Sequence, residues 1–355
     1  MALEERTITI IQADGLYPDT TYEDRLFAPS NNQNYTIEYL QTNLWPTGVA
    51  NSRPWTDIDP TLRQRVNGIL TLKMRMTAAD VALFPNLRVV VRMGVGYDRL
   101  DRAALHAAGV TVCNVPDYGT CEIADHAIGL ALSLRRGILL HHEHQRADPP
   151  APWMYIDSPL VSRLQKATFG IVGLGRIGTA VALRAKAFGW DVLFYDPYAP
   201  NGIDKALGVE RTRDLMELFR RSTTLSLHCP CTRETRGMVN YSLLSLLPRG
   251  AVFVNTARGE CMDLNGVERC LREGIISGAG LDVLPEEPIP EDNVHSLIQA
   301  YRRKEEWLTG RMVVTCHTAF YSPQSFVDIR EKSAQTMRDV LVDGLKSNII
   351  TVDMD

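Results

Sequence analysis

The stretch that decides the fold begins Ala167-Thr-Phe-Gly-Ile-Val-Gly-Leu-Gly-Arg-Ile-Gly178 and closes with Asp191-Val-Leu-Phe-Tyr-Asp196. The apolar run before Gly173 is typical of a buried parallel strand. Apolar residues at helical spacing follow the glycines, and a second apolar run leads to Asp196. The stretch therefore predicts a strand, a tight turn, a helix and a second strand, which together form one βαβ unit.

Three glycines, Gly173, Gly175 and Gly178, form the pattern G-x-G-x-x-G between the first strand and the helix. The first glycine allows the tight turn, the second lets a pyrophosphate approach the backbone, and the third lets helix and strand pack closely. The phosphates then sit at the helix N-terminus, where free N–H groups and the helix dipole favour negative charge. The alternative interpretation is a structural glycine turn in some other α/β protein.

Asp196 ends the second strand, 18 residues after Gly178, and is followed by Pro197 and Tyr198 with no arginine nearby. A carboxylate at this place accepts hydrogen bonds from ribose hydroxyls and repels a 2′-phosphate. The sequence therefore predicts a dinucleotide cofactor and favours NAD over NADP.

The composition is that of an ordinary globular chain. Its 355 residues are enough for two domains, and 45% of them are hydrophobic and 23% charged. The net charge of −4 gives no electrostatic reason to expect a nucleic acid or a membrane surface as partner. No apolar run approaches the length of a membrane span, and the acidic start Met1-Ala-Leu-Glu-Glu-Arg6 is unlike a secretory signal. We therefore expect a cytoplasmic protein, with a nuclear location left open.

The seven cysteines are odd in number and scattered, and only Cys229 and Cys231 lie close together. A C-x-C pair alone is not a metal site, so we expect no metal. Reduced thiols in an intracellular protein are the preferred interpretation.

Strands alternate with helices ahead of the glycine pattern. The sequence predicts strands at residues 7–12, 35–40, 68–72, 87–93 and 110–115. It predicts one helix that starts near residue 59 and two further helices at 77–84 and 98–108. This alternation implies parallel βαβ units and a doubly wound sheet. Because this first unit has no glycine pattern, we expect it to bind another ligand, the substrate.

A long helical pattern from Thr120 to about His144 is predicted to connect two domains, and the nucleotide unit begins near Arg163. Further apolar runs predict strands at 223–227, 251–255, 278–281 and 312–315, with helices at 213–220, 242–246 and 263–273. A final amphipathic helix, residues 322–346, is expected to fold back onto the first unit.

Chemically capable side chains follow three separate strands of the second unit. In open α/β sheets, ligands bind beyond the carboxyl ends of the strands, and Arg258, Asp282, Glu287 and His317 all lie there. An arginine can hold a carboxylate in a planar fork, a histidine can donate a proton, and a glutamate can keep the imidazole protonated. This is the set needed to reduce a 2-oxo acid, and Asp282 is a candidate contact for nicotinamide. Taken singly, a histidine is more often structural than catalytic, and an arginine can simply lie on a solvated loop.

The loop Gly94-Val95-Gly96 follows a strongly apolar strand of the first unit. Flanking glycines leave backbone N–H groups open to an anion such as a substrate carboxylate. A plain strand-to-helix turn explains the loop equally well.

Taken together, the motifs resemble the D-isomer-specific 2-hydroxyacid dehydrogenases over nearly the whole chain. The matching segments are residues 94–98, 114–116, 120–125, 170–178, 227–230 with Thr235, 254–259, 281–283 with 287–288, and 317–319. Within that family, Cys113-Asn-Val-Pro116 and His317-Thr-Ala-Phe-Tyr-Ser322 look most like the C-terminal binding protein branch, whose members are NAD(H)-binding corepressors.

The resemblance implies two α/β domains with doubly wound parallel sheets, a Rossmann NAD-binding domain inserted into a flavodoxin-like substrate domain. The substrate domain would comprise residues 1–118 plus 320–355 and the NAD-binding domain residues 119–319, with the active site in the cleft between them. The helix at 120–144 would build a homodimer.

The resemblance also assigns roles to single residues. Arg258 becomes the substrate-binding arginine, His317 the proton donor and Glu287 its partner. Substrate-binding residues are Gly94, Val95, Gly96 and Arg258. The residues that fall where the family touches NAD are Thr120, Gly173, Gly175, Arg176, Ile177, Gly178, Asp196, Cys229, Thr235, Thr256, Asp282 and His317.

The chain departs from the family pattern in three ways. The link between the Glu-Pro motif and His317 is long and includes Ala300-Tyr-Arg-Arg-Lys-Glu-Glu-Trp307, which looks helical and would cover the cleft or extend a subunit contact. Phe320 stands where the corepressor branch commonly has Trp, so a smaller ring could widen the pocket. The long C-terminal tail of the corepressors is not part of this sequence.

Two functions remain open from the sequence. The first is an NAD-dependent enzyme that interconverts a 2-oxo acid and a D-2-hydroxy acid. The second is a corepressor-like protein that senses NAD(H) and turns over weakly. A formate-dehydrogenase-like enzyme is disfavoured because that relative has Gln in place of Glu287. Four aromatic residues either line the substrate pocket, which would favour an apolar side chain, or pack in the core: Tyr97, Tyr118, Phe320 and Tyr321.

Overall fold

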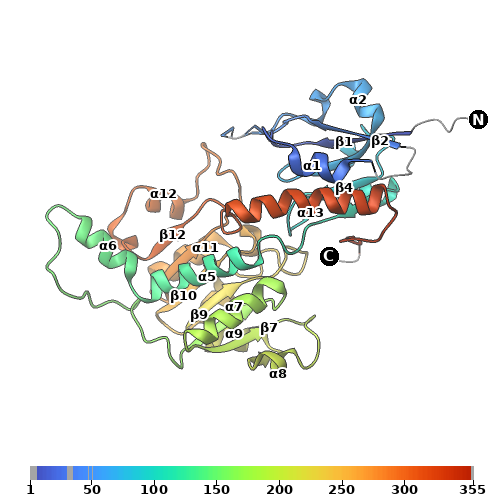
Figure 1. Cartoon of the computed structure of the whole chain (residues 1–355). Helices are drawn as coiled ribbons and strands as arrows, with labels where there is room; N and C mark the ends of the chain where they lie inside the picture. The colour runs from blue at the N-terminus through green and yellow to red at the C-terminus, as the bar shows by residue number, and fades with distance from the viewer. Residues whose placement is uncertain (1–5, 30–34, 47, 50, 353–355) are drawn as a thin grey trace, which may run out of the picture. The chain divides into compact units, whose positions relative to one another are not determined.

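Two parallel β-sheets organise the chain in the computed structural model, which describes residues 6–29, 35–46, 48–49 and 51–352. The chain divides into two units, Met1–Tyr118 with Ser322–Asp355 and Gly119–Tyr321. Each unit is an α/β fold with its own sheet, and every named strand pair is parallel (Figure 1). The predicted fold class is confirmed.

The first unit has a sheet with the strand order β2-β1-β3-β4-β5, which is the flavodoxin-like order. Its strands are β1 (Arg6–Gln12), β2 (Tyr35–Gln41), β3 (Val66–Thr71), β4 (Val89–Arg92) and β5 (Thr111–Cys113). Its helices are α1 (Thr21–Phe27), η1 (Trp55–Asp57), α2 (Pro60–Arg65), α3 (Ala78–Val81), α4 (Arg102–Ala107) and α13 (Pro323–Leu341).

Helix α13 returns to the first unit, as expected, and packs on β3 and β4. A Cβ atom on Gly68 of β3 would lie 2.6 Å from the sulfur of Met337 and 2.9 Å from a methyl carbon of Leu341, so the glycine leaves room for these two helix side chains against the strand. Ser322 caps the helix by accepting a hydrogen bond from the backbone N–H of Ser325, and Pro323 occupies its first position. The helix ends at Leu341, five residues before the predicted end.

A buried ion pair joins α13 to α1. Arg330 donates from Nη2 and Nε to the two carboxylate oxygens of Glu23, at 2.6 and 2.8 Å, and the side chains are 10% and 1% exposed. The guanidinium also lies 4.3 Å from the ring centroid of Tyr17. Because removing one partner of such a pair strands the other charge in a poorly solvated place, the pair should be costly to break.

We expect Glu23→Ala to lower the free energy of unfolding by about 3–5 kcal/mol, the usual cost of breaking a buried pair. The matched control is Glu331→Ala, which removes the exposed pair of Glu331 with Arg25 between the same two helices and should cost about 1 kcal/mol or less. Urea unfolding of both variants measures the difference. Equal losses would show that the Glu23 pair behaves like a surface contact.

The second unit has the strand order β12-β11-β10-β9-β6-β7-β8. Counted from β6, this is the Rossmann order 3-2-1-4-5-6 with one more strand at the end. The strands are β6 (Thr168–Val172), β7 (Asp191–Tyr195), β8 (Glu210–Thr212), β9 (Thr224–Leu227), β10 (Ala251–Asn255), β11 (Ile276–Leu281) and β12 (Met312–Val314). The helices are α5 (Thr120–Arg135), α6 (Ile138–Arg146), α7 (Arg176–Ala187), α8 (Ile203–Leu207), α9 (Leu215–Arg221), α10 (Tyr241–Leu244), η2 (Gly259–Cys261), α11 (Leu264–Arg272), α12 (Ser296–Arg302) and η3 (Glu306–Leu308).

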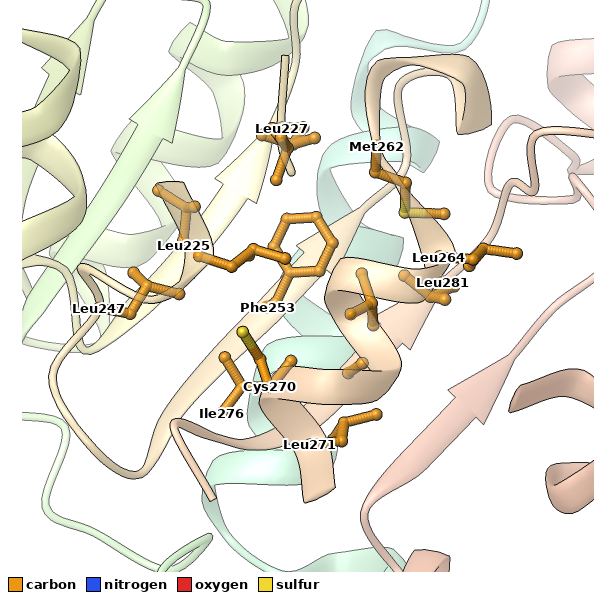
Figure 2. Close-up of a cluster of buried hydrophobic side chains, with 14 of the residues drawn as sticks. Leu225, Leu227, Leu247, Phe253, Met262, Leu264, Cys270, Leu271, Ile276 and Leu281 are labelled. Atoms are coloured by element: carbon orange, nitrogen blue, oxygen red, sulfur yellow. The ribbon is translucent and has the colours of Figure 1, made fainter. Parts of the chain in front are cut away.

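Both faces of this sheet are covered, and alternate residues of β10 divide between two apolar clusters. Phe253 packs under α11 with Leu225, Leu271 and other side chains (Figure 2). Val252 and Val254 belong to the cluster on the opposite face, which includes residues of α5 and α7. A sheet buried on both sides explains why its strands read as continuous apolar runs.

Two local predictions for this unit were wrong or incomplete. The single helix predicted for residues 120–144 is two helices, because Gly137 adopts a left-handed conformation with φ of 61° and separates α5 from α6. The short elements α8 and β8 were not predicted. They contribute few residues to the apolar pattern, so the sequence signal for them is weak.

Candidate active site

The glycine turn follows β6 and begins α7. A Cβ atom on Gly173 would lie 2.8 Å from the backbone of His228 and Cys229, and one on Gly178 would lie 2.0 Å from the carbonyl oxygen of Gly173. A Cβ on Gly175 would meet no heavy atom within 4 Å. The fold therefore explains the first and third glycines, whereas the space beside the second suits an external group such as a pyrophosphate.

The first turn of α7 is open to an anion. Gly175 occupies the N-cap position, and no side chain caps the helix. Arg176, the first helical residue, is exposed, and Ile177 is half-buried. Uncapped N–H groups at a helix N-terminus bind phosphate well.

Asp196 ties the end of β7 to the glycine turn. One carboxylate oxygen accepts from the backbone N–H of Leu174 at 2.8 Å, and the other accepts from those of Tyr198 and Ala199 at 2.9 and 3.1 Å. Asp196 is still half-exposed, and an ionised carboxylate has about four acceptor positions, so it can also bind ribose hydroxyls.

The prediction that no arginine lies near Asp196 was wrong, because it considered only neighbours in sequence. Arg211 of β8 lies beside the turn and donates hydrogen bonds to the carbonyl oxygens of Asp196 and Ala199, both at 3.0 Å. These bonds turn part of the guanidinium toward the protein backbone, and the Asp196 carboxylate still faces the glycine turn.

Two buried hydroxyls of the second unit have no hydrogen-bond partner within the described residues. They belong to Thr120, at the start of α5, and Thr256, directly after β10. A buried hydroxyl left without a partner costs about 1–3 kcal/mol, so each fits a position that a ligand satisfies. Both residues were predicted cofactor contacts.

Cys229 and Thr235 lie in the segment after β9. Cys229 is buried, and a hydrogen bond with the thiol of Cys261 holds the pKa of Cys229 below its usual range. Thr235 donates from its hydroxyl to the carbonyl oxygen of Pro230 at 2.6 Å and accepts from the N–H of Thr232 at 2.8 Å. The hydroxyl of Thr235 therefore stabilises the loop on which these predicted contacts lie.

His317 and Glu287 meet beyond the ends of β12 and β11. Nδ1 of His317 lies 2.6 Å from one carboxylate oxygen of Glu287, and the other oxygen accepts from the N–H of Leu284 at 2.8 Å. The side chains are 35% and 24% exposed. The glutamate thus orients the ring through Nδ1, and Nε2 lies on the opposite side of the imidazole.

The loop of His317 is built around Asp282, a role that sequence analysis missed. The buried Asp282 carboxylate accepts from the Thr315 hydroxyl at 2.5 Å and from the N–H groups of Thr318 and Ala319 at 2.9 and 3.0 Å. Its carbonyl oxygen accepts from the N–H of His317 at 2.7 Å. These bonds hold His317 in a left-handed conformation, with φ of 54°, that few non-glycine residues adopt.

Arg258 lies on the neighbouring loop after β10. The buried Asn255 accepts from the N–H of Ala257 at 3.0 Å and donates to the carbonyl oxygen of Arg258 at 2.9 Å, which shapes the loop. A Cβ on Gly259 would lie 1.9 Å from the carbonyl carbon of Leu284. The loops that carry Arg258 and Glu287 therefore pack directly against each other, as the adjacent strands β10 and β11 require.

In the first unit, the loop after β4 has a defined shape. Gly94 has a φ of 149°, Val115 donates its N–H to the carbonyl oxygen of Gly94 at 3.1 Å, and the Asn114 amide donates to that of Val95 at 2.7 Å. Val95 and Gly96 are half-buried. The protein thus holds the carbonyl groups of Gly94 and Val95, and the amide of Gly94 donates to the carbonyl oxygen of Arg92 at 2.8 Å. The amides of Val95 and Gly96 remain as the groups that suit an anion.

A family model described as the NAD-binding domain of the D-isomer specific 2-hydroxyacid dehydrogenases matches residues 128–319, which is more than half of the chain. The chain belongs to this family.

Relatives of known function agree with this assignment. The dehydrogenase chain is 39% identical to a glyoxylate reductase of Korarchaeum cryptofilum over 263 residues, 72% of this chain and 76% of the relative. It is 31% identical to C-terminal-binding protein 1 of Caenorhabditis elegans over 283 residues, 79% of this chain but only 38% of that longer protein. A D-lactate dehydrogenase of Aquifex aeolicus, solved with NAD and lactic acid, has 25% identity and a TM-score of 0.76 over 96% of this chain and 98% of its own. The dehydrogenase is therefore an NAD-dependent oxidoreductase of this family.

The extra segment of this dehydrogenase is only partly helical. Helix α12 ends at Arg302, Lys304 is left-handed with φ of 54°, and a short 3-10 turn follows at η3. The arginine of α11, Arg272, lies 4.0 Å from the ring centroid of Trp307. The segment thus packs against α11 of its own unit.

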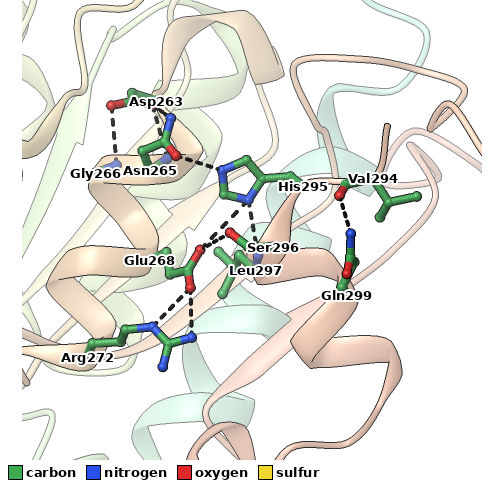
Figure 3. Close-up of polar contacts among 10 residues, drawn as sticks. All are labelled: Asp263, Asn265, Gly266, Glu268, Arg272, Val294, His295, Ser296, Leu297 and Gln299. Carbon is green, nitrogen blue, oxygen red and sulfur yellow. Dashed lines mark hydrogen bonds and ion pairs between the residues drawn. The ribbon is translucent and has the colours of Figure 1, made fainter. Parts of the chain in front are cut away.

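His295 makes the same connection at the start of α12 (Figure 3). Its Nδ1 accepts from the N–H of Leu297 at 3.1 Å, and its Nε2 lies 3.1 Å from the side-chain oxygen of Asn265. Ser296 donates to Glu268 of α11 at 2.5 Å. The polar contacts in Figure 3 thus hold the start of α12, which leads into the extra segment, against α11.

Three of the four aromatic residues proposed to line the pocket have surroundings that fit core packing or exposure to solvent better. Tyr118 is buried, Tyr97 lies 4.7 Å from the Arg102 guanidinium, and Tyr321 is 60% exposed. Phe320 is the one whose ring lies against His317, edge to face at 6.4 Å between centroids.

Neither a membrane span nor a metal cluster is found in the part of the chain that the structure describes. None of its helices is long and apolar enough to cross a bilayer. No group of three or more His, Cys, Asp or Glu side chains among those residues is arranged to hold a metal ion.

Proposed function

We propose that this dehydrogenase interconverts a 2-oxo acid and a D-2-hydroxy acid. The observation that carries the proposal is the contact of 2.6 Å between Nδ1 of His317 and the carboxylate of Glu287. The loop that carries Glu287 packs directly against the loop that carries Arg258. Both loops lie at the carboxyl edge of the sheet that bears the glycine turn. The reaction needs one group that donates a proton and another that binds the substrate carboxylate, and this edge offers both.

In this mechanism Arg258 binds the substrate carboxylate and polarises the carbonyl oxygen. His317 donates a proton from Nε2 to that oxygen during reduction, while Glu287 holds Nδ1 and stabilises the imidazolium. The amides of Val95 and Gly96 are proposed as a further contact of a substrate carboxylate, whereas that of Gly94 already donates to the carbonyl oxygen of Arg92. NADH, when bound, supplies the hydride. The open turn at Gly175, the Asp196 carboxylate and the two unpartnered threonine hydroxyls fit that cofactor.

The test is NADH oxidation by the purified protein with a panel of 2-oxo acids that includes glyoxylate, pyruvate, phenylpyruvate and branched members. Turnover on one or more members, lost in Arg258→Ala and His317→Ala, supports the proposal and names the substrate class. Turnover no greater than that of the two variants, across the whole panel, contradicts it.

A second candidate is an NAD(H)-sensing protein with weak turnover, favoured by the 31% identity to C-terminal-binding protein 1. In this case NADH would change the oligomeric state, and a homodimer would be the active form. Light scattering with and without NADH measures this. A nucleotide-dependent change in mass together with negligible turnover would favour the second candidate over the first.

The pH dependence of the two reaction directions should have opposite slopes. Reduction needs a protonated His317, whereas oxidation of the hydroxy acid needs a neutral His317 to accept the proton. We therefore expect kcat/KM for reduction to fall, and that for oxidation to rise, as the pH increases. Initial rates in both directions measure this. Parallel or flat profiles would count against His317 as the group that carries the proton.

A further inference from the structure

The loop of His317 has a support outside its own segment. His126, on the helix α5, places Nε2 3.0 Å from the hydroxyl oxygen of Thr315 and 3.7 Å from the nearer carboxylate oxygen of Asp282. The His126 side chain is 25% exposed and that of Asp282 is 1% exposed. His126 therefore contacts Thr315 and Asp282, the two residues whose hydrogen bonds support the His317 loop.

The direction of these hydrogen bonds follows from the number of protons available. The Thr315 hydroxyl has one hydrogen, and it points to the Asp282 carboxylate at 2.5 Å. The Thr315 oxygen can then only accept from His126, so the hydrogen on the His126 ring lies on Nε2. A neutral histidine meets this requirement, and no charge on His126 is needed.

We propose that His126 is a positioning residue for the proton donor. Its Nε2–H fixes the Thr315 hydroxyl, which fixes Asp282, and Asp282 holds the backbone of His317, Thr318 and Ala319. The left-handed backbone at His317 persists only while its surroundings enforce it, because few non-glycine residues adopt it. Loss of the His126 bond removes one of those constraints. The role rests on the proposed function, since it matters for catalysis only if His317 donates the proton.

Two substitutions separate hydrogen bonding from simple packing. His126→Gln keeps an N–H donor near the position of Nε2, whereas His126→Leu keeps most of the volume and removes the donor. We expect His126→Leu to lower kcat for glyoxylate reduction about tenfold or more, as a misplaced catalytic group does. The KM for NADH should stay within about twofold, and His126→Gln should retain most of kcat. Equal kcat values in the two variants would overturn the proposal.

Amide hydrogen exchange tests the same chain of contacts without any need for turnover. In the peptide that spans residues 315–321, exchange should be faster in His126→Leu than in wild type and near wild type in His126→Gln. Exchange that is unchanged, or raised equally in both, overturns the positioning role. If the variants exchange as expected but wild type reduces no 2-oxo acid, the proposed function fails, and what stands is that His126 supports the backbone of the His317 loop.

A third variant covers the case in which His126→Leu does not fold. Thr315→Val has nearly the same shape as threonine and breaks both hydrogen bonds at the hydroxyl while His126 remains. It should raise exchange at residues 317–319 and lower kcat as His126→Leu does. Wild-type exchange and kcat in Thr315→Val would overturn the proposal.

Discussion

Replacing His317 by alanine is expected to lower kcat for 2-oxo acid reduction by roughly 10²–10⁴-fold, the usual contribution of a general acid. The substitution removes the ring that Glu287 orients and leaves water to protonate the carbonyl oxygen. NADH should still bind, because the glycine turn and Asp196 are untouched, and any loss of affinity from the predicted contact of His317 itself should be small beside the loss of kcat. Steady-state kinetics and a fluorescence titration with NADH measure the two effects.

The matched control is His295→Ala. His295 also lies near a glutamate of the same unit, Glu268, with 4.0 Å between Nδ1 and the carboxylate oxygen. His295 belongs to the polar contacts that hold the start of α12 against α11. Its loss should therefore affect stability and leave kcat within about threefold of wild type. A kcat for His317→Ala that is no lower than that for His295→Ala would remove His317 from the mechanism.

The second large effect is expected at the glycine turn. In Gly178→Ala the new methyl group would lie 2.0 Å from the carbonyl oxygen of Gly173, so α7 and β6 must move apart. We expect a loss of about 3 kcal/mol in the free energy of unfolding, at the upper end for overpacking. Chemical unfolding without cofactor measures it.

Gly175→Ala is the partner experiment, because the same methyl group meets no protein atom there. Gly175 has a φ of −73°, which alanine adopts without strain. The free energy of unfolding should change by less than about 1 kcal/mol, the scale of a lost N-cap preference. The methyl group would instead occupy the space proposed for the pyrophosphate, so the Kd for NADH should rise at least tenfold. Unchanged NADH affinity would show that the cofactor does not approach this glycine.

Much of the fold was predictable because buried parallel strands carry a strong signal. Val89–Arg92 and Ala251–Asn255 are apolar runs of strand length, and their alternation with helical spacing implies parallel sheets. The break between α5 and α6 was not predictable from spacing, since apolar residues continue on both sides of Gly137. A single glycine inside a helical pattern is often tolerated, and only the three-dimensional context decides whether it turns the chain.

The candidate site was predicted residue by residue, but the reasons for its shape were not. Arg258, Glu287 and His317 could be named because each follows a predicted strand. Asp282 was predicted only as a cofactor contact, and the structure adds that its carboxylate holds the loop of His317. The contacts of Arg211 with Asp196 and of His126 with Thr315 join residues 15 and 189 positions apart in sequence. Short-range patterns carry no information about such pairs.

The division of the first unit between the two ends of the chain has a consequence for its synthesis. Residues up to Tyr118 emerge from the ribosome before the segment from Ser322 onward, which completes the unit. About 200 residues of the second unit lie between them, which takes roughly 10–40 seconds to translate at the usual rate. During that time the surface of β3 around Gly68 lacks the helix that covers it. The nascent first unit thus exposes an apolar sheet face until the segment from Ser322 onward has been made.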